Sequence, residues 1–110
     1  SAPRGAEAEY LKRVVTGVAE RAGELDGFIE KHAVGWQLHR ISSTAAAIMR
    51  VAIFETLYMP DIPISSSIDA AVDLAKKYET PETAAFINGV LGAFARSEGA
   101  FSKSELLYGP

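Results

Sequence analysis

Cysteine is absent from this 110-residue sequence, and histidine occurs only twice, as His32 and His39. Without thiols the chain can form no disulfide and can use no thiolate chemistry. Two histidines seven residues apart, with no cysteine or clustered carboxylates beside them, lack the ligand set of a typical zinc site. We therefore predict no metal and no cofactor, and structural or surface roles for both histidines.

An excess of positive charge is also missing. The chain has 11 Lys and Arg residues against 14 Asp and Glu residues, which gives a formal net charge of -3. An overall basic field therefore cannot attract nucleic acid, and RNA binding would need a local basic patch. No signal peptide and no bilayer-spanning apolar run is visible. We expect a cytoplasmic location, with which these absences are compatible, and no interaction with membranes.

Catalytic motifs are absent as well. Asp69 and Asp73 are one helical turn apart and could share a face, but nothing beside them indicates the opposed environments of a catalytic pair. The serines at 65–67 have the pattern of turn and capping residues. Gly89 and Gly92 lie within a helical pattern and lack the lysine of a phosphate-binding loop. We predict that the protein is not an enzyme.

The most apolar stretch is Thr44–Tyr58, in which Arg50 and Glu55 are the only charged residues. An all-apolar helix of this length is typical of a buried core helix. Hydroxyl residues precede it and prolines at 60 and 63 follow it, as expected for helix ends. Arg50 and Glu55 either pair with other helices or form a polar contact with a partner.

Apolar residues spaced three and four apart predict one long helix from Ala6 to Lys31. Its glycines, at 17, 23 and 27, indicate close helix packing or a bend near Gly23. The segment 32–41 has no helical period, and we interpret it as a connector anchored to the core by Trp36. The apolar stripe consists of Leu11, Val14, Val15, Val18, Ala22, Leu25, Phe28 and Ile29.

Two further helices follow the central one. Ser66 to Asp69 fits a variant capping box, which predicts a helix that ends near Tyr78. Thr80-Pro81-Glu82 predicts the start of the last helix, which should end near residues 97–99. We expect a single all-α domain over 1–110, with a frayed end at 1–5, a helical core over 6–97 and a tail over 98–110.

One set of residues has the chemistry of RNA binding. Lys76 and Lys77 could bind phosphates, Phe86 could stack on a base, and Asn88 lies two residues beyond it. Alternatively, Phe86 is a core residue and the two lysines are the solvated end of a helix.

Six segments resemble, in order and spacing, those of the NusB family of bacterial transcription antitermination factors. The resemblance extends from about Tyr10 to Gly99. The segments are Leu25–Ile29, Trp36 with Arg40–Ile41, Met49–Glu55, Asp61–Pro63, Ala71–Tyr78 and Phe86–Leu91.

This resemblance implies a NusB-like helical bundle of two packed three-helix subdomains, the first of them incomplete. It implies binding of boxA-type RNA together with NusE, a ribosomal protein, in the transcription elongation complex, without enzymatic activity. The implied RNA-binding residues are Phe86, Asn88, Lys76 and Lys77. The implied partner-binding residues are Ala45, Arg50, Glu55 and Glu82.

The sequence departs from the family pattern in three places. The family begins with an arginine-rich helix that has no counterpart before Ala6, so we expect that helix to be missing and its apolar contacts to be replaced in a homodimer. Ala45 and Ala46 replace residues that are usually charged, and Ala70 replaces a usual glutamate. We expect these changes to weaken RNA and partner binding.

Two alternatives remain. One is the NusB-like accessory domain of a ribosomal RNA cytosine methyltransferase, which would need a glycine-rich cofactor loop and catalytic cysteines, neither of which this sequence contains. The other is a helical protein-interaction module that does not bind RNA.

Overall fold

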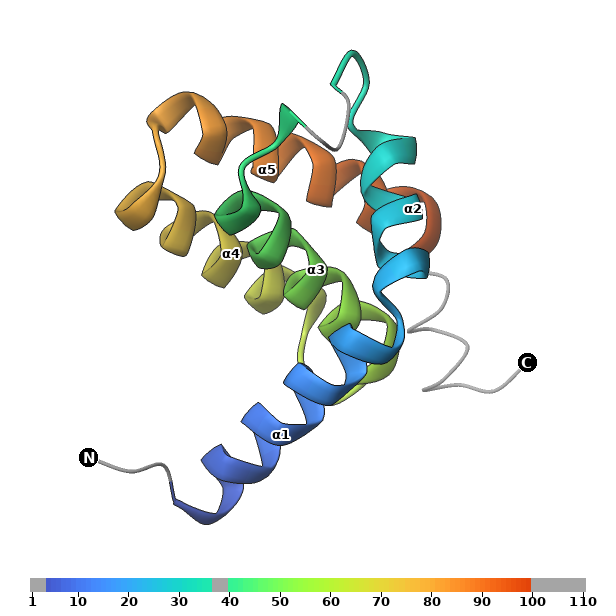
Figure 1. Ribbon diagram of the computed structural model, residues 1–110, viewed down its shortest axis with the longest axis vertical. Helices are drawn as coiled ribbons and strands as arrows, with labels where there is room; N and C mark the ends of the chain where they lie inside the picture. Colours follow the sequence, from blue (N-terminus) through green and yellow to red (C-terminus); the bar gives the residue numbers. More distant parts are fainter. Residues whose placement is uncertain (1–3, 37–39, 100–110) are drawn as a thin grey trace.

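The apolar stretch predicted as the core helix forms α3, and it contacts every other described helix in the computed structural model (Figure 1). Ten of its residues are buried, as an all-apolar helix requires. The Ser42 hydroxyl caps it by accepting a hydrogen bond from the Ala45 amide at 3.0 Å. The structure describes residues 4–36 and 40–99. The helices are α1 (Gly5–Glu20), α2 (Ala22–His32), α3 (Ser43–Tyr58), α4 (Ile64–Tyr78), α5 (Pro81–Phe94) and the π-helical turn η2 (Ala95–Gly99).

The prediction of a single helix over residues 6–31 is wrong, because α1 and α2 are separated at Arg21. This residue has φ -118° and ψ 20°, outside the helical region. Its guanidinium lies 4.1 Å from the centre of the Tyr58 ring and donates a hydrogen bond to the Tyr58 hydroxyl at 3.2 Å. The break lies two residues before Gly23, where a bend was expected.

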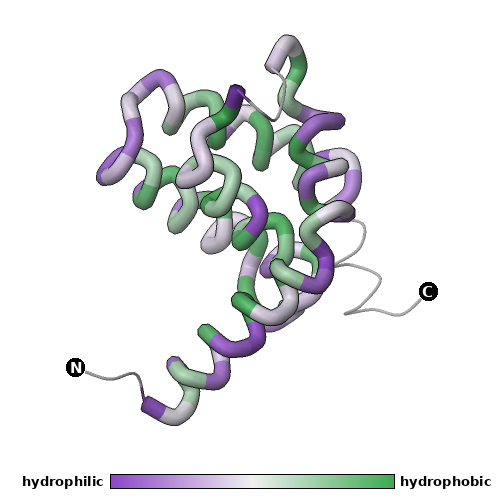
Figure 2. Tube along the Cα trace, viewed as in Figure 1, coloured by the Kyte–Doolittle hydropathy of each residue, from purple (hydrophilic) through white to green (hydrophobic). Residues whose placement is uncertain are grey.

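The close approach predicted from the glycines occurs at Gly17. A Cβ atom at this position would overlap the ring of Phe54 on α3, whereas Gly23 and Gly27 face open space. The N-terminal end of α1 projects from the rest of the molecule (Figure 1). Hydrophilic and hydrophobic residues alternate along it (Figure 2).

Of the two predicted helix starts, the one at α4 is wrong and the one at α5 is confirmed. The capping box at Ser66 is wrong: α4 begins at Ile64, and the amides of Ser66 and Ser67 already donate to the Pro63 carbonyl within its first turn. The start of α5 is confirmed, because the Thr80 hydroxyl accepts a hydrogen bond from the Thr83 amide at 3.0 Å. After Phe94 the chain continues as the π-helical turn η2.

The core lies where α2, α4 and α5 meet α3. In it, Phe28 packs edge-on against Phe94, with ring centres 5.2 Å apart. Each large side chain that is fully buried contributes about 1.5–3 kcal/mol of hydrophobic stabilisation, so this core holds α4 and α5 firmly against each other. Its most deeply buried large side chains are Phe94, Leu25, Ile29, Met49, Ile53, Ile87 and Leu91.

The described residues form helices, turns and loops without a strand, which confirms the all-α fold class. In the part of the chain that the structure describes, none of the helices has the length and hydrophobicity needed to cross a membrane.

Trp36 was predicted to anchor the connector to the core, and its contact lies at the edge of the core. Trp36 is 44% exposed and packs against Phe86 of α5, with ring centres 4.7 Å apart. It follows Gly35, whose φ of 83° is in the region that favours glycine. The predicted tail, apart from Glu98 and Gly99, lies outside the described residues, as does His39.

Candidate RNA and partner surfaces

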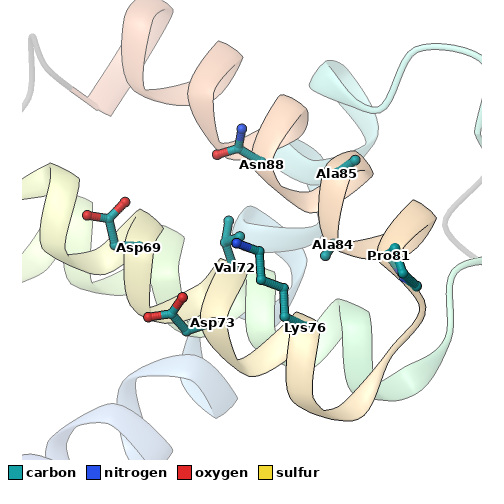
Figure 3. A pocket seen from close by; sticks show the side chains of 8 residues that line it. All are labelled: Asp69, Val72, Asp73, Lys76, Pro81, Ala84, Ala85 and Asn88. Carbon is teal, nitrogen blue, oxygen red and sulfur yellow. The ribbon is translucent and has the colours of Figure 1, made fainter.

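A groove of about 800 Å³ lies between α4 and α5. Asp69, Asp73 and Lys76 follow one another along α4, and Asn88 lies across from them on α5 (Figure 3). The spacing of these α4 residues places them on one helix face. The remaining lining residues are Val72, Pro81, Ala84 and Ala85.

The four polar side chains of this α4–α5 groove have no interaction partner in the described part of the chain. None of them forms a hydrogen bond or an ion pair with another residue in the described ranges 4–36 and 40–99. Their donors and acceptors are therefore free to meet a ligand, as expected of convergent polar groups in a binding site.

Phe86 is on the opposite flank of α5 from the groove. Residues 86 and 88 differ by about 200° around the helix axis, so Asn88 faces α4 while Phe86 faces the connector between α2 and α3. There Phe86 is half-buried against the core and covered in part by Trp36. The structure thus brings Lys76 and Asn88 together and separates Phe86 from them.

Lys77 lies beside the groove rather than in it. It is exposed in the last turn of α4, and its ammonium is 5.3 Å from the centre of the Tyr78 ring. Both lysines therefore place positive charge at the C-terminal end of α4, where it also suits the helix dipole.

Arg50 is paired across helices, which was one of its two predicted roles. Its Nε donates to Asp26 Oδ1 at 2.6 Å and its Nη2 donates to Asp26 Oδ2 at 3.2 Å. This two-pronged geometry joins α2 to α3 and is the strong form of a charge-assisted hydrogen bond. Its role in partner binding stays a prediction.

Glu55 is 7% exposed and accepts a hydrogen bond from the hydroxyl of Tyr10. Burial, together with this hydrogen bond and the carboxylate charge, raises the pKa of Tyr10 to about 12. The contact joins α1 to α3, so Glu55 has a structural role whether or not it also contacts a partner.

The other two predicted partner-binding residues are in contrasting environments. Ala45 is 0% exposed, so in this structure its side chain packs inside the protein. Glu82 is exposed in the first turn of α5, four residues before Phe86, and therefore lies on the same flank of the helix.

His32 is part of a polar cluster between α2 and η2. Its Nε2 is 3.0 Å from a Glu98 carboxylate oxygen, and the Lys31 ammonium is 3.0 Å from the other oxygen. The hydrogen bond to His32, reinforced by Lys31, lowers the pKa of Glu98. Within residues 4–36 and 40–99, no three His, Cys, Asp or Glu side chains are grouped so that they could hold a metal ion.

Sequence reasoning missed two features of these surfaces. It noted that Asp69 and Asp73 could share a helix face, but it weighed them as a catalytic pair and not as part of a binding groove. It expected Trp36 to anchor the connector to the core, but no pattern in the sequence indicated that this contact is with Phe86, which is 50 residues away.

Comparison with known proteins identifies the family. The NusB family model matches residues 2–96. The chain belongs to the NusB family. The resemblance seen in the sequence is thereby confirmed, and so are the all-helical NusB fold and membership of a family of non-enzymatic antitermination factors.

Curated relatives in this family are named "Transcription antitermination protein NusB". The relative from Ruminiclostridium cellulolyticum is 44% identical over 90 residues, which are 82% of this chain and 62% of the relative. The relative from Acetivibrio thermocellus is 49% identical over 84 residues, which are 76% of this chain and 58% of the relative. This chain therefore spans about three fifths of the length of these relatives.

The fold agrees with a solved NusB structure. The chain is similar to NusB from T. maritima with a TM-score of 0.85 and 31% sequence identity, over 93% of this chain and 72% of that one. With 93% of this chain covered, the likeness extends to the helices that form the α4–α5 groove.

Proposed function

We propose that this protein binds RNA and a protein partner in transcription antitermination, in the cytoplasm and as part of the transcription elongation complex. The observation that carries the proposal is its NusB family membership over residues 2–96, with relatives named as antitermination proteins. The α4–α5 groove adds support, because its polar side chains lie at the surface and have no partner in the described part of the chain.

The RNA in this proposal is of the boxA type. Lys76 and Lys77 would bind its phosphates, and Asn88 would form hydrogen bonds with it from the facing helix. Phe86, on the other flank of α5, would stack on a separate base with Trp36 beside it. A single-stranded RNA would then cross α5, which the extended backbone of such RNA allows.

The protein partner in this proposal is NusE. Glu82 is exposed and can contact it directly, while Arg50 is half-buried and already held by Asp26. Ala45 and Glu55 are buried, so they would act by shaping the surface of α3 rather than by direct contact. A fixed internal contact keeps a partner surface preorganised and so reduces the cost of binding.

The test is a titration of the protein with boxA-type RNA, with and without NusE, at several salt concentrations. Binding should be tighter with NusE than without it and weaker for a scrambled RNA. It should also fall as salt rises, and Lys76→Ala should reduce the salt slope by roughly 0.7, the value for one phosphate contact on single strands. NusE binding without any RNA binding would indicate an interaction module instead.

A further inference from the structure

We propose that the α4–α5 groove recognises a guanine base of single-stranded RNA, with Asp69 and Asp73 as hydrogen-bond acceptors, Asn88 as a donor and Lys76 on the adjoining phosphate. This inference rests on the proposed function and adds a base preference and two acidic residues to it.

The polar groups of the groove complement the edge of guanine. In its Watson–Crick edge, guanine presents two neighbouring donors, the N1 hydrogen and the N2 amine, beside the O6 acceptor. A carboxylate can accept from both donors, and an amide NH₂ can donate to O6. Asp69 and Asp73 supply carboxylates from α4, and Asn88 supplies an amide from α5 across the groove (Figure 3).

The apolar part of the groove suits the flat face of a base. Val72, Pro81, Ala84 and Ala85 form the rest of its lining. At about 800 Å³, the groove has the size typical of small-molecule sites. Its side chains lie on two helices that the core fixes together, so the groove is largely preformed.

The acidic residues are the decisive feature, because carboxylates would weaken a site that binds only phosphates. Two carboxylates beside Lys76 repel an RNA backbone, yet they accept hydrogen bonds from base amines. Neither of them is neutralised by an ion pair with another residue of the described chain. Base recognition gives these free acceptors a role.

The test compares Asp73→Asn and Asp69→Asn with Asp61→Asn, a matched control on the exposed turn before α4 and outside the groove. Each variant is titrated with short single-stranded oligoribonucleotides that contain guanosine, inosine or uridine at one position. Inosine lacks only the N2 amine. Circular dichroism checks that each variant is folded.

Removing a negative charge should strengthen RNA binding wherever the charge only repels phosphates, and we expect this for Asp61→Asn with every oligonucleotide. In contrast, Asp73→Asn and Asp69→Asn should weaken guanosine binding by roughly tenfold, the effect of losing one good base contact. They should also abolish the preference of the unaltered protein for guanosine over inosine.

Two results would overturn the inference while leaving the proposed function intact. The unaltered protein could bind RNA without preferring guanosine, or the groove variants could strengthen all binding as Asp61→Asn does. If an arginine-rich peptide shifts the NMR signals of Asp73 and Asn88 while RNA shifts neither, the groove is a protein site and the inference is wrong. If no RNA binds at all, both this inference and the proposed RNA-binding function are wrong.

Discussion

The contacts between α1, α2 and α3 and the groove between α4 and α5 use polar side chains in opposite ways. On the first side, Arg50 is held by Asp26, Glu55 accepts from Tyr10, and the Tyr58 hydroxyl donates to Glu24 at 2.6 Å. In the groove, two carboxylates, an ammonium and an amide have no partner among the described residues. Side chains paired internally contribute to stability, whereas uncommitted ones are available to a ligand.

This contrast predicts that substitutions among the α1, α2 and α3 contacts change folding, while substitutions near the groove change binding. Gly17→Ala should have one of the largest effects on stability. Its new Cβ overlaps the buried ring of Phe54, so we expect a loss of about 1–3 kcal/mol, typical of overpacking. The matched control is Gly89→Ala on α5, where the added Cβ meets open space.

In urea unfolding, Gly89→Ala should stabilise the protein by up to about 1 kcal/mol, because alanine favours a helix over glycine. Opposite signs for the two substitutions support the contrast. A loss of similar size at both positions would contradict it.

Phe86→Ala tests a residue whose loss could affect both stability and RNA binding, since Phe86 packs against the core and is partly exposed beside Trp36. We expect RNA affinity to fall by about 1–3 kcal/mol through lost base stacking, and stability to fall by less. RNA titration and urea unfolding measure the two effects. The stability control is Phe28→Ala, because Phe28 is also half-buried and packs against Phe94. If Phe86→Ala loses about 3–5 kcal/mol of stability with RNA affinity unchanged, Phe86 is only a core residue.

The exposed apolar residues of α1 predict self-association of the 110-residue chain. Leu11 is 46% exposed and Val15 is 67% exposed on a helix that projects from the molecule, and such surfaces are commonly covered by a partner. Light scattering over a dilution series should show a dimer that Val15→Glu weakens at least tenfold, by about 1.4 kcal/mol or more.

The control is Asn88→Glu in the α4–α5 groove. It introduces the same negative charge as Val15→Glu and should leave the dimer unchanged. A monomer at every concentration of the unaltered chain would rule out this contact.

Asp26→Asn should cost about 1 kcal/mol, because it weakens a two-pronged contact with Arg50 that is partly open to solvent. Asp73→Asn makes the same chemical change at a residue that has no partner within residues 4–36 and 40–99, and its effect on stability should stay within about 0.5 kcal/mol. Thermal unfolding of the two variants compares them directly, and equal losses would mean that the Asp26 contact is not stabilising.

The smallest effect should be a pH dependence at η2. Since the pKa of Glu98 is lowered in the folded protein, its contact with His32 and Lys31 stabilises the fold above the ordinary pKa of 4.5. This stabilisation is lost as the pH falls through the lowered value. The difference in melting temperature between the unaltered protein and Glu98→Gln should therefore be larger at about pH 6 than at about pH 3. A difference that does not change with pH would contradict this account.

Local sequence patterns predicted the helices well where the signal lies within one helix. The apolar run of α3, its hydroxyl cap and the Thr80-Pro81 start of α5 depend on neighbouring residues, and all three were confirmed. The predicted capping box failed because the turn after Pro63 already places Ser66 inside the helix. Local capping signals compete with one another, and the backbone conformation decides between them.

The candidate site was only partly predictable. The sequence predicted that Lys76 and Asn88 act together and that Asp69 and Asp73 share a helix face. It could not indicate that all four line one groove, because that depends on how α4 packs against α5. It grouped Phe86 with Asn88, although the turn of the helix places them on opposite flanks.

Hydrophobic period and capping residues are local properties of the chain, and they were enough to predict the all-helical fold class and the central position of α3. The order and spacing of the motifs were enough to predict the family. Three features emerged only in the folded protein: the interruption of the helix at Arg21, the pairing of Arg50 with Asp26 and the packing of Trp36 against Phe86. Each of these depends on contacts between residues that are distant in sequence. The hydrophobic effect requires such contacts but does not specify which polar partners they bring together.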